Sequence, residues 1–196
     1  MYSVNYAAQV KAFCYAVSMR GILARFDTGI TQLVQSWPHW LEFPMVIVTF
    51  LGQPFFTVGI ALAIAAYGFY KTNEKLVLAG SAAAITFGIC SLLKAFLKRD
   101  RPETDYVNNM FFDTFSFPSG HAAGAMVTYG LLAYFAIMYL PQPWNIVAAV
   151  ALGILIFLIG ISRIYLGAHY PSDVIGGWLL GAAGLYVIIH YIKPVL

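Results

Sequence analysis

Charged residues are scarce in this chain. Only 10% of its 196 residues are Asp, Glu, Lys or Arg, whereas about a quarter of a typical soluble domain is charged. The hydrophobic share is 61% and the mean hydropathy is +0.77. This composition predicts a single membrane-embedded domain over residues 1–196, surrounded by membrane lipids. The net charge of +3 is small and the basic residues adjoin apolar runs, so no nucleic-acid partner is expected.

Several other signals are also missing. The two cysteines, Cys14 and Cys90, lie far apart in apolar surroundings and are typical of small buried hydrophobic residues, so they say nothing about the redox compartment. The first residues lack the basic start and compact apolar core of a cleavable signal peptide, and we expect none. We find no internal repeat and no low-complexity segment. Nothing in the sequence indicates an oligomeric state.

Long apolar stretches are abundant. A helix needs about 20 mostly apolar residues to cross a bilayer, because its backbone must satisfy its own hydrogen bonds there. Five stretches qualify, at residues 44–70, 76–93, 122–140, 144–161 and 174–191. Gly and Ala recur along several of them, which lets helices approach closely. The sequence therefore predicts an all-α, multi-pass transmembrane helical bundle with five spans.

The first forty residues are ambiguous. Residues 4–26 are apolar enough for a sixth span, but Lys11 lies near the middle, and polar residues recur from it at seven-residue spacing. That spacing also fits a helix lying in the membrane interface. We favour the sixth span and keep the interfacial helix as the alternative. Residues 26–40, which include Asp27, are predicted to form a second interfacial stretch.

The order of the spans predicts which loops share a side of the membrane. Loops 94–121 and 162–173 should open on one side, and the turns at 71–75 and 141–143 on the other. The second side holds three lysines against one acid, namely Lys71, Lys75, Lys193 and Glu74. Positively charged loops tend to stay in the cytoplasm. The first side is therefore predicted to face outward from the cell membrane.

Three polar clusters interrupt the apolar sequence, all on the side predicted to face outward. The first contains Lys94 and the pair Arg101-Pro102. The two cations would share one helix face if the helix continues to Pro102, which should end it. Arg and Lys are suited to gripping phosphate oxygens. A solvated basic helix end is the alternative, and Lys98 and Arg99 fit that simpler role.

The second cluster is Pro118-Ser119-Gly120-His121, at the start of an apolar stretch. Ser is a good N-cap, Gly lets a ligand approach the backbone, and a helix N-terminus offers free N–H groups to an anion. His121 would lie in the first turn, beside anything bound there. An ordinary capping turn with a histidine at the water boundary is the alternative.

The third cluster contains Ser162-Arg163, His169 and Asp173. A carboxylate four residues after an imidazole can reach it across one helical turn and hold one nitrogen as a donor, which leaves the other nitrogen free as a nucleophile. The helical geometry is an assumption here, since the intervening loop contains Gly and Pro. An ion pair between Arg163 and Asp173 is the alternative, but it does not account for the second histidine.

Metal binding fits these clusters poorly. His121 and His169 are accompanied by cations rather than by carboxylates, and Lys or Arg beside a divalent ion would be repelled. We therefore expect a phosphate site with no metal and no other cofactor.

Together the clusters resemble the signature of the type 2 phosphatidic acid phosphatase and haloperoxidase superfamily, and the resemblance is strongest over residues 90–180. It implies a metal-independent phosphatase with a phosphohistidine intermediate. His169 is implied as the nucleophile, Asp173 as the group that orients it, and His121 as the acid that protonates the leaving oxygen. The residues implied to hold the phosphoryl oxygens are Lys94, Arg101, Arg163, Ser119 and Gly120. Membrane members of the family have six helices, which favours the sixth span.

The substrate remains a choice among several lipids. The family also includes soluble vanadium haloperoxidases, but five or six spans in this chain argue against that activity. The size resembles compact bacterial enzymes acting on undecaprenyl pyrophosphate, phosphatidylglycerol phosphate or phosphatidic acid, so a lipid phosphate substrate is expected. Two alternatives stay open: a lipid phosphotransferase that uses the same site, and a non-catalytic membrane scaffold.

Overall fold

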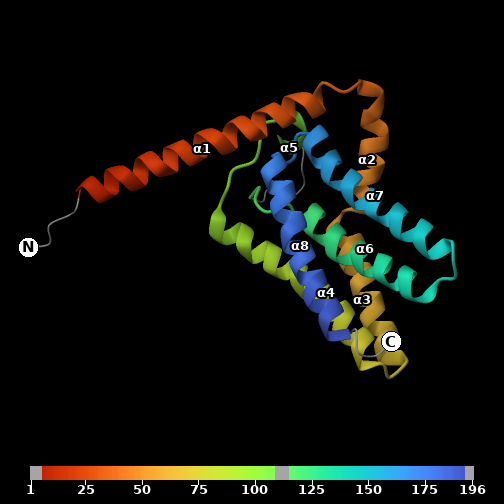
Figure 1. Cartoon of the computed structure of the whole chain (residues 1–196). Coiled ribbons are helices and arrows are strands. Elements are labelled where there is room, and N and C mark those ends of the chain that lie inside the picture. Colours follow the sequence, from red (N-terminus) through yellow and green to blue (C-terminus); the bar gives the residue numbers. More distant parts are fainter. Residues whose placement is uncertain (1–5, 109–114, 193–196) are drawn as a thin grey trace, which may run out of the picture.

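The computed structural model describes residues 6–108 and 115–192, and the regular elements in these two segments are all helices. Figure 1 shows their arrangement. Their bounds are α1 Tyr6–Gln35, η1 His39–Leu41, α2 Glu42–Leu51, α3 Pro54–Tyr70, α4 Glu74–Leu97, α5 Asp105–Asn108, α6 Gly120–Tyr139, α7 Trp144–Tyr165 and α8 Pro171–Ile192. The predicted all-α class is confirmed.

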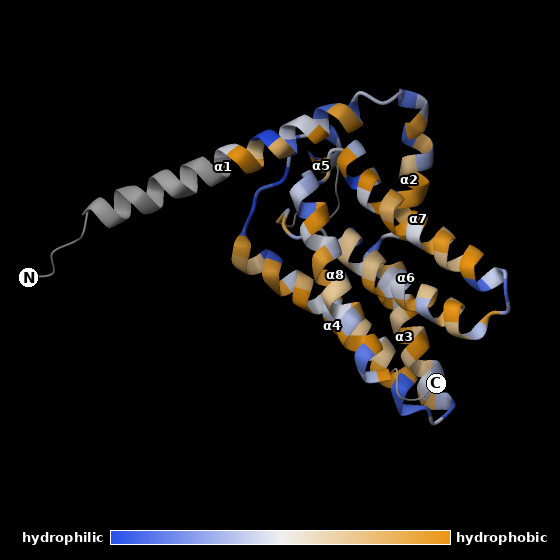
Figure 2. Cartoon of the chain, viewed as in Figure 1, coloured by the Kyte–Doolittle hydropathy of each residue, from blue (hydrophilic) through white to orange (hydrophobic). Residues whose placement is uncertain are grey.

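Five helical segments are long and apolar enough to cross a membrane. They are residues 39–70, which include α2 and α3, and the helices α4, α6, α7 and α8. Hydrophobic residues cover these helices (Figure 2), and side chains such as Phe69 and Phe96 are 80% and 81% exposed. Apolar surface this extensive is unusual on a soluble monomer but suits contact with lipid tails. The five spans match the five predicted stretches.

The bundle is built around α6, the most deeply buried of these helices, which packs against α3, α4, α7 and α8. Its side chains Val127 and Leu131 meet Ala83 of α4 and Ile188 of α8 in one apolar core. Small residues allow close approach at the end nearest the polar clusters. A Cβ atom at Gly177 of α8 would lie 2.5 Å from the backbone oxygen of Ser119, so α8 can lie against the start of α6 only because this residue is Gly.

The stretch predicted as one span at 44–70 is broken in the middle. α2 ends at Leu51 and α3 begins at Pro54, because Pro54 has no N–H to donate and cannot continue the helix from α2. The carbonyl of Leu51 accepts a hydrogen bond of 2.7 Å from the hydroxyl of Tyr129 in α6. Irregular backbone at membrane depth is tolerated where protein groups satisfy it. Gly52, in the break, is buried against His121 and Ile159.

The N-terminal region differs from the prediction. Residues 4–26 and 26–40 were expected to be two separate stretches, but residues 6–35 form the single helix α1, while residues 4 and 5 lie outside the described part. Figure 1 shows α1 extending sideways from the bundle, with its C-terminal part over the ends of α7 and α8. Within the described residues, α1 is not among the helices long and apolar enough to cross a membrane, so the predicted sixth span is not confirmed.

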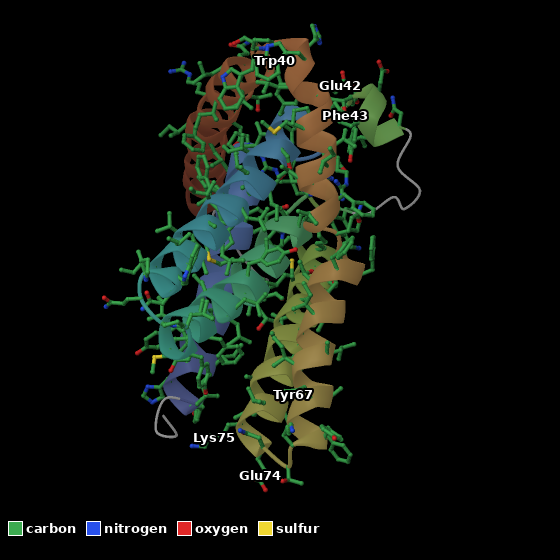
Figure 3. The ribbon with its side chains drawn as sticks, turned by 90° about the vertical axis from the view of Figure 1, so that its right-hand side faces the viewer. Trp40, Glu42, Phe43, Tyr67, Glu74 and Lys75 are labelled. Carbon is green, nitrogen blue, oxygen red and sulfur yellow. The ribbon has the colours of Figure 1, made fainter. Side chains whose placement is uncertain are left out.

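The two ends of the bundle carry the polar and aromatic residues. Figure 3 shows Trp40, Glu42 and Phe43 at one end and Tyr67, Glu74 and Lys75 at the other. Aromatic and charged residues at both ends are typical of a bundle whose ends lie in the membrane interfaces. The loops that contain the three clusters lie at the first of these ends, as their predicted topology requires.

Candidate active site

The helix that carries the start of the first cluster, α4, ends earlier than predicted. The helix was expected to continue to Pro102, but α4 ends at Leu97 and Lys98 adopts the left-handed conformation with φ 48°. This is the geometry of a common helix C-cap. Arg101 therefore reaches the site from a loop rather than from the helix face that carries Lys94.

The third cluster begins α8 without the predicted helical turn between its two key residues. His169 lies in the loop before the helix, and Asp173 is the third residue of α8. Oδ2 of Asp173 accepts a hydrogen bond of 2.8 Å from the backbone N–H of Tyr170, which is half of a capping box. The distance from Oδ2 to Nδ1 of His169 is 3.6 Å. The expected carboxylate–imidazole pair is present, with the two groups in ion-pair range.

Asp173 is the meeting point of the three clusters, although it is fully buried. Its Oδ1 accepts a hydrogen bond of 2.7 Å from Nη1 of Arg99, and its Oδ2 accepts a short one from the hydroxyl of Ser116. Its backbone oxygen accepts a bond of 2.9 Å from the N–H of Ser119. The predicted alternative, an ion pair with Arg163, is wrong, because Arg99 is the arginine that pairs with this carboxylate.

The second nitrogen of His169 faces a guanidinium group. Nε2 lies 3.4 Å from Nη1 of Arg101, and the same Nη1 donates a bond of 2.9 Å to the backbone oxygen of Ala168. His169 is only 2% exposed. Burial, followed by the charges of Arg163, Lys94 and Arg101, lowers the pKa of His169 well below its ordinary value. The imidazole is therefore neutral near pH 7, as a nucleophile must be.

Arg163 is almost completely buried at the end of α7, with 1% of its surface exposed. Its Nη1 donates hydrogen bonds to the hydroxyls of Thr49, at 2.7 Å, and Tyr106, at 3.2 Å. The guanidinium carbon also lies 5.5 Å from the centre of the Tyr106 ring, within the range of a cation–π contact. Neutral groups hold this charge in place, which leaves it available to an anion.

Lys94 and the second cluster lie side by side. Nζ of Lys94 donates hydrogen bonds to the backbone oxygens of Phe115, at 2.8 Å, and Ser116, at 3.2 Å. Ser119 is buried at the N-cap of α6, with its Oγ 3.5 Å from the N–H of Ala122. A Cβ atom added to Gly120 would lie 3.9 Å from Cε of Lys94. The predicted N-cap is confirmed, and the helix N-terminus lies beside a cation.

His121 is buried in the first turn of α6, where it was expected. Within the described residues, three buried polar nitrogens of these clusters have no hydrogen-bond partner: Nε2 of His121, Nε of Arg163 and Nδ1 of His169. Buried polar groups are nearly always satisfied in native proteins, and exceptions gather at functional sites. Nδ1 of His169 faces Asp173, whereas the nitrogens of His121 and Arg163, in clusters rich in cations, point to an anionic ligand.

Carboxylate clusters suited to a metal ion are not found in the part of the chain that the structure describes. The site is instead dominated by Lys94, Arg101 and Arg163. The expectation that catalysis needs no metal stays a prediction, which a chelation experiment can test.

Sequence reasoning missed several residues of the site. Arg99 was assigned to a solvated helix end, and this assignment is wrong, because its guanidinium binds two carboxylates. The other missed residues are Asp27, Thr49, Tyr106 and Ser116. Each lies far in sequence from its partner in the site, so no local spacing could have revealed the contact. Asp27 offered one signal, as an isolated acid in an apolar region.

The fold and the site together define the class: a multi-pass membrane protein with a group of cations and buried histidines at one end of its helical bundle. The model of the PAP2 superfamily matches residues 75–195, which include the three clusters. The chain therefore belongs to the PAP2 superfamily, as its sequence motifs indicate.

Proteins of known activity agree with this assignment. Phosphatidylglycerophosphatase B from Bacillus subtilis is 33% identical over 155 residues, covering 76% of this chain and 74% of that protein. Decaprenylphosphoryl-5-phosphoribose phosphatase from Mycobacterium tuberculosis is 35% identical over 114 residues, covering 57% and 58%. The crystal structure of a transmembrane PAP2-type phosphatidylglycerolphosphate phosphatase from Bacillus subtilis matches with a TM-score of 0.76 and 26% identity, covering 95% and 96%. The chain is accordingly an enzyme of a membrane phosphatase family.

Proposed function

We propose that this enzyme hydrolyses a lipid phosphomonoester or pyrophosphate through a phosphohistidine intermediate on His169. The observation that supports this most directly is the orientation of the His169 imidazole. Nδ1 faces Asp173 and Nε2 faces Arg101. With the proton on Nδ1, the lone pair of Nε2 is free to attack phosphorus. Nε2 faces Arg101, and the positive charge of Arg101 would attract the phosphoryl oxygens to this side of the imidazole.

The first half-reaction follows from that orientation. Nε2 of His169 attacks phosphorus, the bond from phosphorus to the lipid oxygen breaks, and His121 donates a proton to the departing oxygen. Asp173 stabilises the imidazolium that develops. In the second half-reaction, water attacks the phosphohistidine, its proton passes to His121, and the bond from nitrogen to phosphorus breaks to release phosphate.

The cations provide the electrostatic part of catalysis. Phosphoryl transfer spreads negative charge over the equatorial oxygens, and fixed donors stabilise that charge strongly in a buried site. Arg101 and Arg163 supply guanidinium donors, and Lys94 supplies a point charge beside the N-terminus of α6. Ser119 and the backbone of Gly120 add neutral donors. These are the phosphate-binding roles that the family signature implies for the five residues.

The substrate class is supported by the relatives and by the membrane setting. The names of the two curated relatives place their substrates among lipids that carry a phosphate group, one with a glycerol-based headgroup and one with a polyprenyl carrier. We propose phosphatidylglycerol phosphate, undecaprenyl pyrophosphate and phosphatidic acid as candidate substrates. A site at one end of the bundle lies at headgroup depth, where such a phosphate would be found.

We further propose that the site faces outward from the cell membrane. Lys75 is partly exposed and lies with Glu74 at the end of the bundle away from Trp40 and Glu42 (Figure 3). Lys71 is exposed in the same turn between α3 and α4, and positively charged loops favour the cytoplasm.

The test of the nucleophile is the variant His169→Ala. It should abolish turnover of the purified enzyme in detergent, while its elution on gel filtration and its thermal stability stay close to those of the wild type. A phosphoenzyme trapped from labelled substrate should be acid-labile and map to His169. Phosphate release by the alanine variant at near the wild-type rate would rule out this mechanism.

The substrate and the cofactor requirement are tested together. The candidate lipids are assayed in detergent with EDTA, and again with an acceptor lipid present. Turnover should persist in EDTA and vanadate should inhibit, because vanadate mimics pentacoordinate phosphorus. Complete loss in EDTA that Mg²⁺ restores would contradict the metal-free mechanism. Phosphate appearing on the acceptor instead of in solution would indicate a phosphotransferase.

A further inference from the structure

Arg99 lies between two buried carboxylates that come from opposite ends of the chain. Its Nη2 is 2.7 Å from Oδ2 of Asp27 in α1, and its Nη1 is 2.7 Å from Oδ1 of Asp173 in α8. Asp27 is 2% exposed and Asp173 is fully buried. A buried carboxylate without a partner is strongly destabilising. One guanidinium group therefore compensates two charges that would otherwise be costly.

Asp27 is itself tied to the first turn of α8. Its Oδ1 accepts a hydrogen bond of 2.8 Å from the backbone N–H of Ser172, and its Oδ2 accepts one of 2.7 Å from the Ser172 hydroxyl. That hydroxyl also accepts a bond of 2.6 Å from Nη1 of Arg99. A carboxylate at a helix N-terminus is favourable, because the free N–H groups there carry partial positive charge. These contacts fasten α1 to the helix that carries Asp173.

Arg99 also determines which way the Asp173 carboxylate points. With Oδ1 held by Arg99, the other oxygen is directed toward Ser116, the N–H of Tyr170 and Nδ1 of His169. The guanidinium carbon lies 4.5 Å from the centre of the Tyr170 ring, and this stacking fixes the plane of the fork. Rotation of the carboxylate away from His169 would break the bond to Arg99.

We propose that Arg99 is a positioning residue for the His169–Asp173 pair, and that Asp27 holds Arg99 in place, so that the seating of α1 on the bundle sets the rate of phosphoryl transfer. This inference rests on the proposed roles of His169 and Asp173. It gives α1 a part in catalysis although the family model does not match residues before 75. Arg99 does not touch the reacting atoms in this proposal. It acts through the carboxylate.

An arginine is required at this position by geometry. The planar fork offers separate nitrogens to two carboxylates at once, whereas the single ammonium group of lysine would have to reach both with one atom. Arg99→Lys should therefore keep a positive charge but recover only part of the activity lost in Arg99→Gln.

The charges around the pair predict a change in pH dependence. Asp173 faces Arg99 directly and Lys94 of α4 at longer range, and Asp27 of α1 lies on the other side of Arg99. His169 faces Arg101, Lys94, Arg163 of α7 and His121 of α6. Removing the positive charge of Arg99 leaves the negative charge of Asp173 less compensated, and this makes protonation of the neighbouring His169 easier. The acid limb of kcat/KM should therefore move to higher pH.

The experiment compares Arg99→Gln, Asp27→Asn and the double variant with the wild type, using phosphatidylglycerol phosphate in detergent. Lys98→Gln is the matched control, since Lys98 is the neighbouring cation and is exposed.

Arg99→Gln should lower kcat about 10- to 100-fold, the usual scale for a residue that orients a reacting group, with KM changed less than about threefold. The double variant should be no slower than Arg99→Gln alone, because Asp27 acts through Arg99. Lys98→Gln should match the wild type.

Two further measurements keep the proposal testable if Arg99→Gln folds poorly. Arg99→Ala should regain activity when guanidinium ion is added at millimolar concentration, whereas Lys98→Ala should show no gain. Arg99→Lys keeps the positive charge, so its kcat should lie between those of Arg99→Gln and the wild type, while its acid limb stays near that of the wild type. A loss confined to KM, a double variant whose losses multiply, or an unmoved acid limb in Arg99→Gln would overturn the proposal.

Failure of this inference is distinct from failure of the proposed function. If His169→Ala is inactive while Arg99→Gln matches the wild type in kcat and pH profile, only the positioning role is wrong. If His169→Ala retains activity, the proposed function itself is wrong.

Discussion

Arg163 combines near-complete burial with partners that are all neutral. Because its guanidinium is held by the hydroxyls of Thr49 and Tyr106, its full charge can stabilise phosphoryl oxygens. We expect Arg163→Gln to lose about 2–4 kcal/mol of transition-state stabilisation, the scale of one oxyanion donor. Thr49→Val keeps the shape but removes one partner, and should cost about tenfold in kcat/KM. Steady-state kinetics measures both losses. If Lys98→Gln lost as much kcat/KM as Arg163→Gln, the cations would act only through their summed charge and not as ligands in a defined pocket.

The pKa of His169 gives a prediction for the acid side of the pH profile. Burial, and then the charges of Arg163, Lys94 and Arg101, lower this pKa well below its ordinary value, which is about 6.5. A lowered pKa keeps the imidazole neutral as the pH falls, so the nucleophile should remain competent below about pH 6.5. The pH dependence of kcat/KM measures this, with ³¹P NMR of the substrate to separate its own ionisation. Neutralising Arg163 should move the acid limb upward.

Local spacing found some site residues and missed others for a clear reason. His169 and Asp173 are four residues apart, and Ser119 directly precedes the helix it caps, so short-range geometry was enough to suggest their contacts. Arg99 meets Asp27, 72 residues away, and Asp173, 74 residues away. Its sequence position beside Lys98 looked like part of a basic helix end. Only the folded chain distinguishes the two cations.

At the scale of helices, the apolar pattern predicted five spans and their order but not their irregularities. Hydropathy reports that a stretch can lie in lipid, and both halves of the broken span at 44–70 satisfy that condition. The break at Gly52 and the early end of α4 at Leu97 depend on backbone conformation, and hydropathy carries no information about backbone conformation. Pro54 offered the one local signal of a break, because it removes a helical donor.

The break between α2 and α3 should matter for catalysis as well as for folding. A Cβ atom at Gly52 would lie 2.5 Å from Cγ2 of Ile159 and 3.2 Å from Cδ2 of His121, and Ile159 is fully buried. We expect Gly52→Ala to destabilise the protein by about 1–3 kcal/mol, as overpacking does, and to lower kcat by displacing His121. Thermal unfolding in detergent and steady-state kinetics measure the two effects.

Gly59 of α3 provides the matched control for Gly52→Ala. A Cβ atom there would meet nothing within 4 Å, and Ala is favoured over Gly inside a helix by about 0.5–1 kcal/mol. Gly59→Ala should therefore keep full activity with equal or higher thermal stability. Similar behaviour of the two variants would mean that the close contact at Gly52 is relieved without consequence.

At the scale of the whole molecule, the site and the turn that carries Lys71 and Lys75 lie at opposite ends. The sequence predicted this separation from the order of the spans, and Figure 1 shows the turn between α3 and α4 at the end of the bundle away from α5 and the start of α8. The course of α1 was harder to predict. Its composition fits either a span or an interfacial helix, and contacts such as the one between Asp27 and Ser172 decide where it lies.

Sidedness can be measured with single cysteines in a background that lacks Cys14 and Cys90. Asn108 is exposed in α5 beside the site, and Gln142 is exposed in the turn between α6 and α7. The order of the spans predicts that they lie on opposite sides of the membrane. Because positively charged turns favour the cytoplasm, Asn108→Cys should react with a membrane-impermeant maleimide in intact cells. Gln142→Cys should react only after lysis, and labelling of both after lysis is the control. The reverse pattern would place the site in the cytoplasm and exclude a role on lipid phosphates of the outer leaflet.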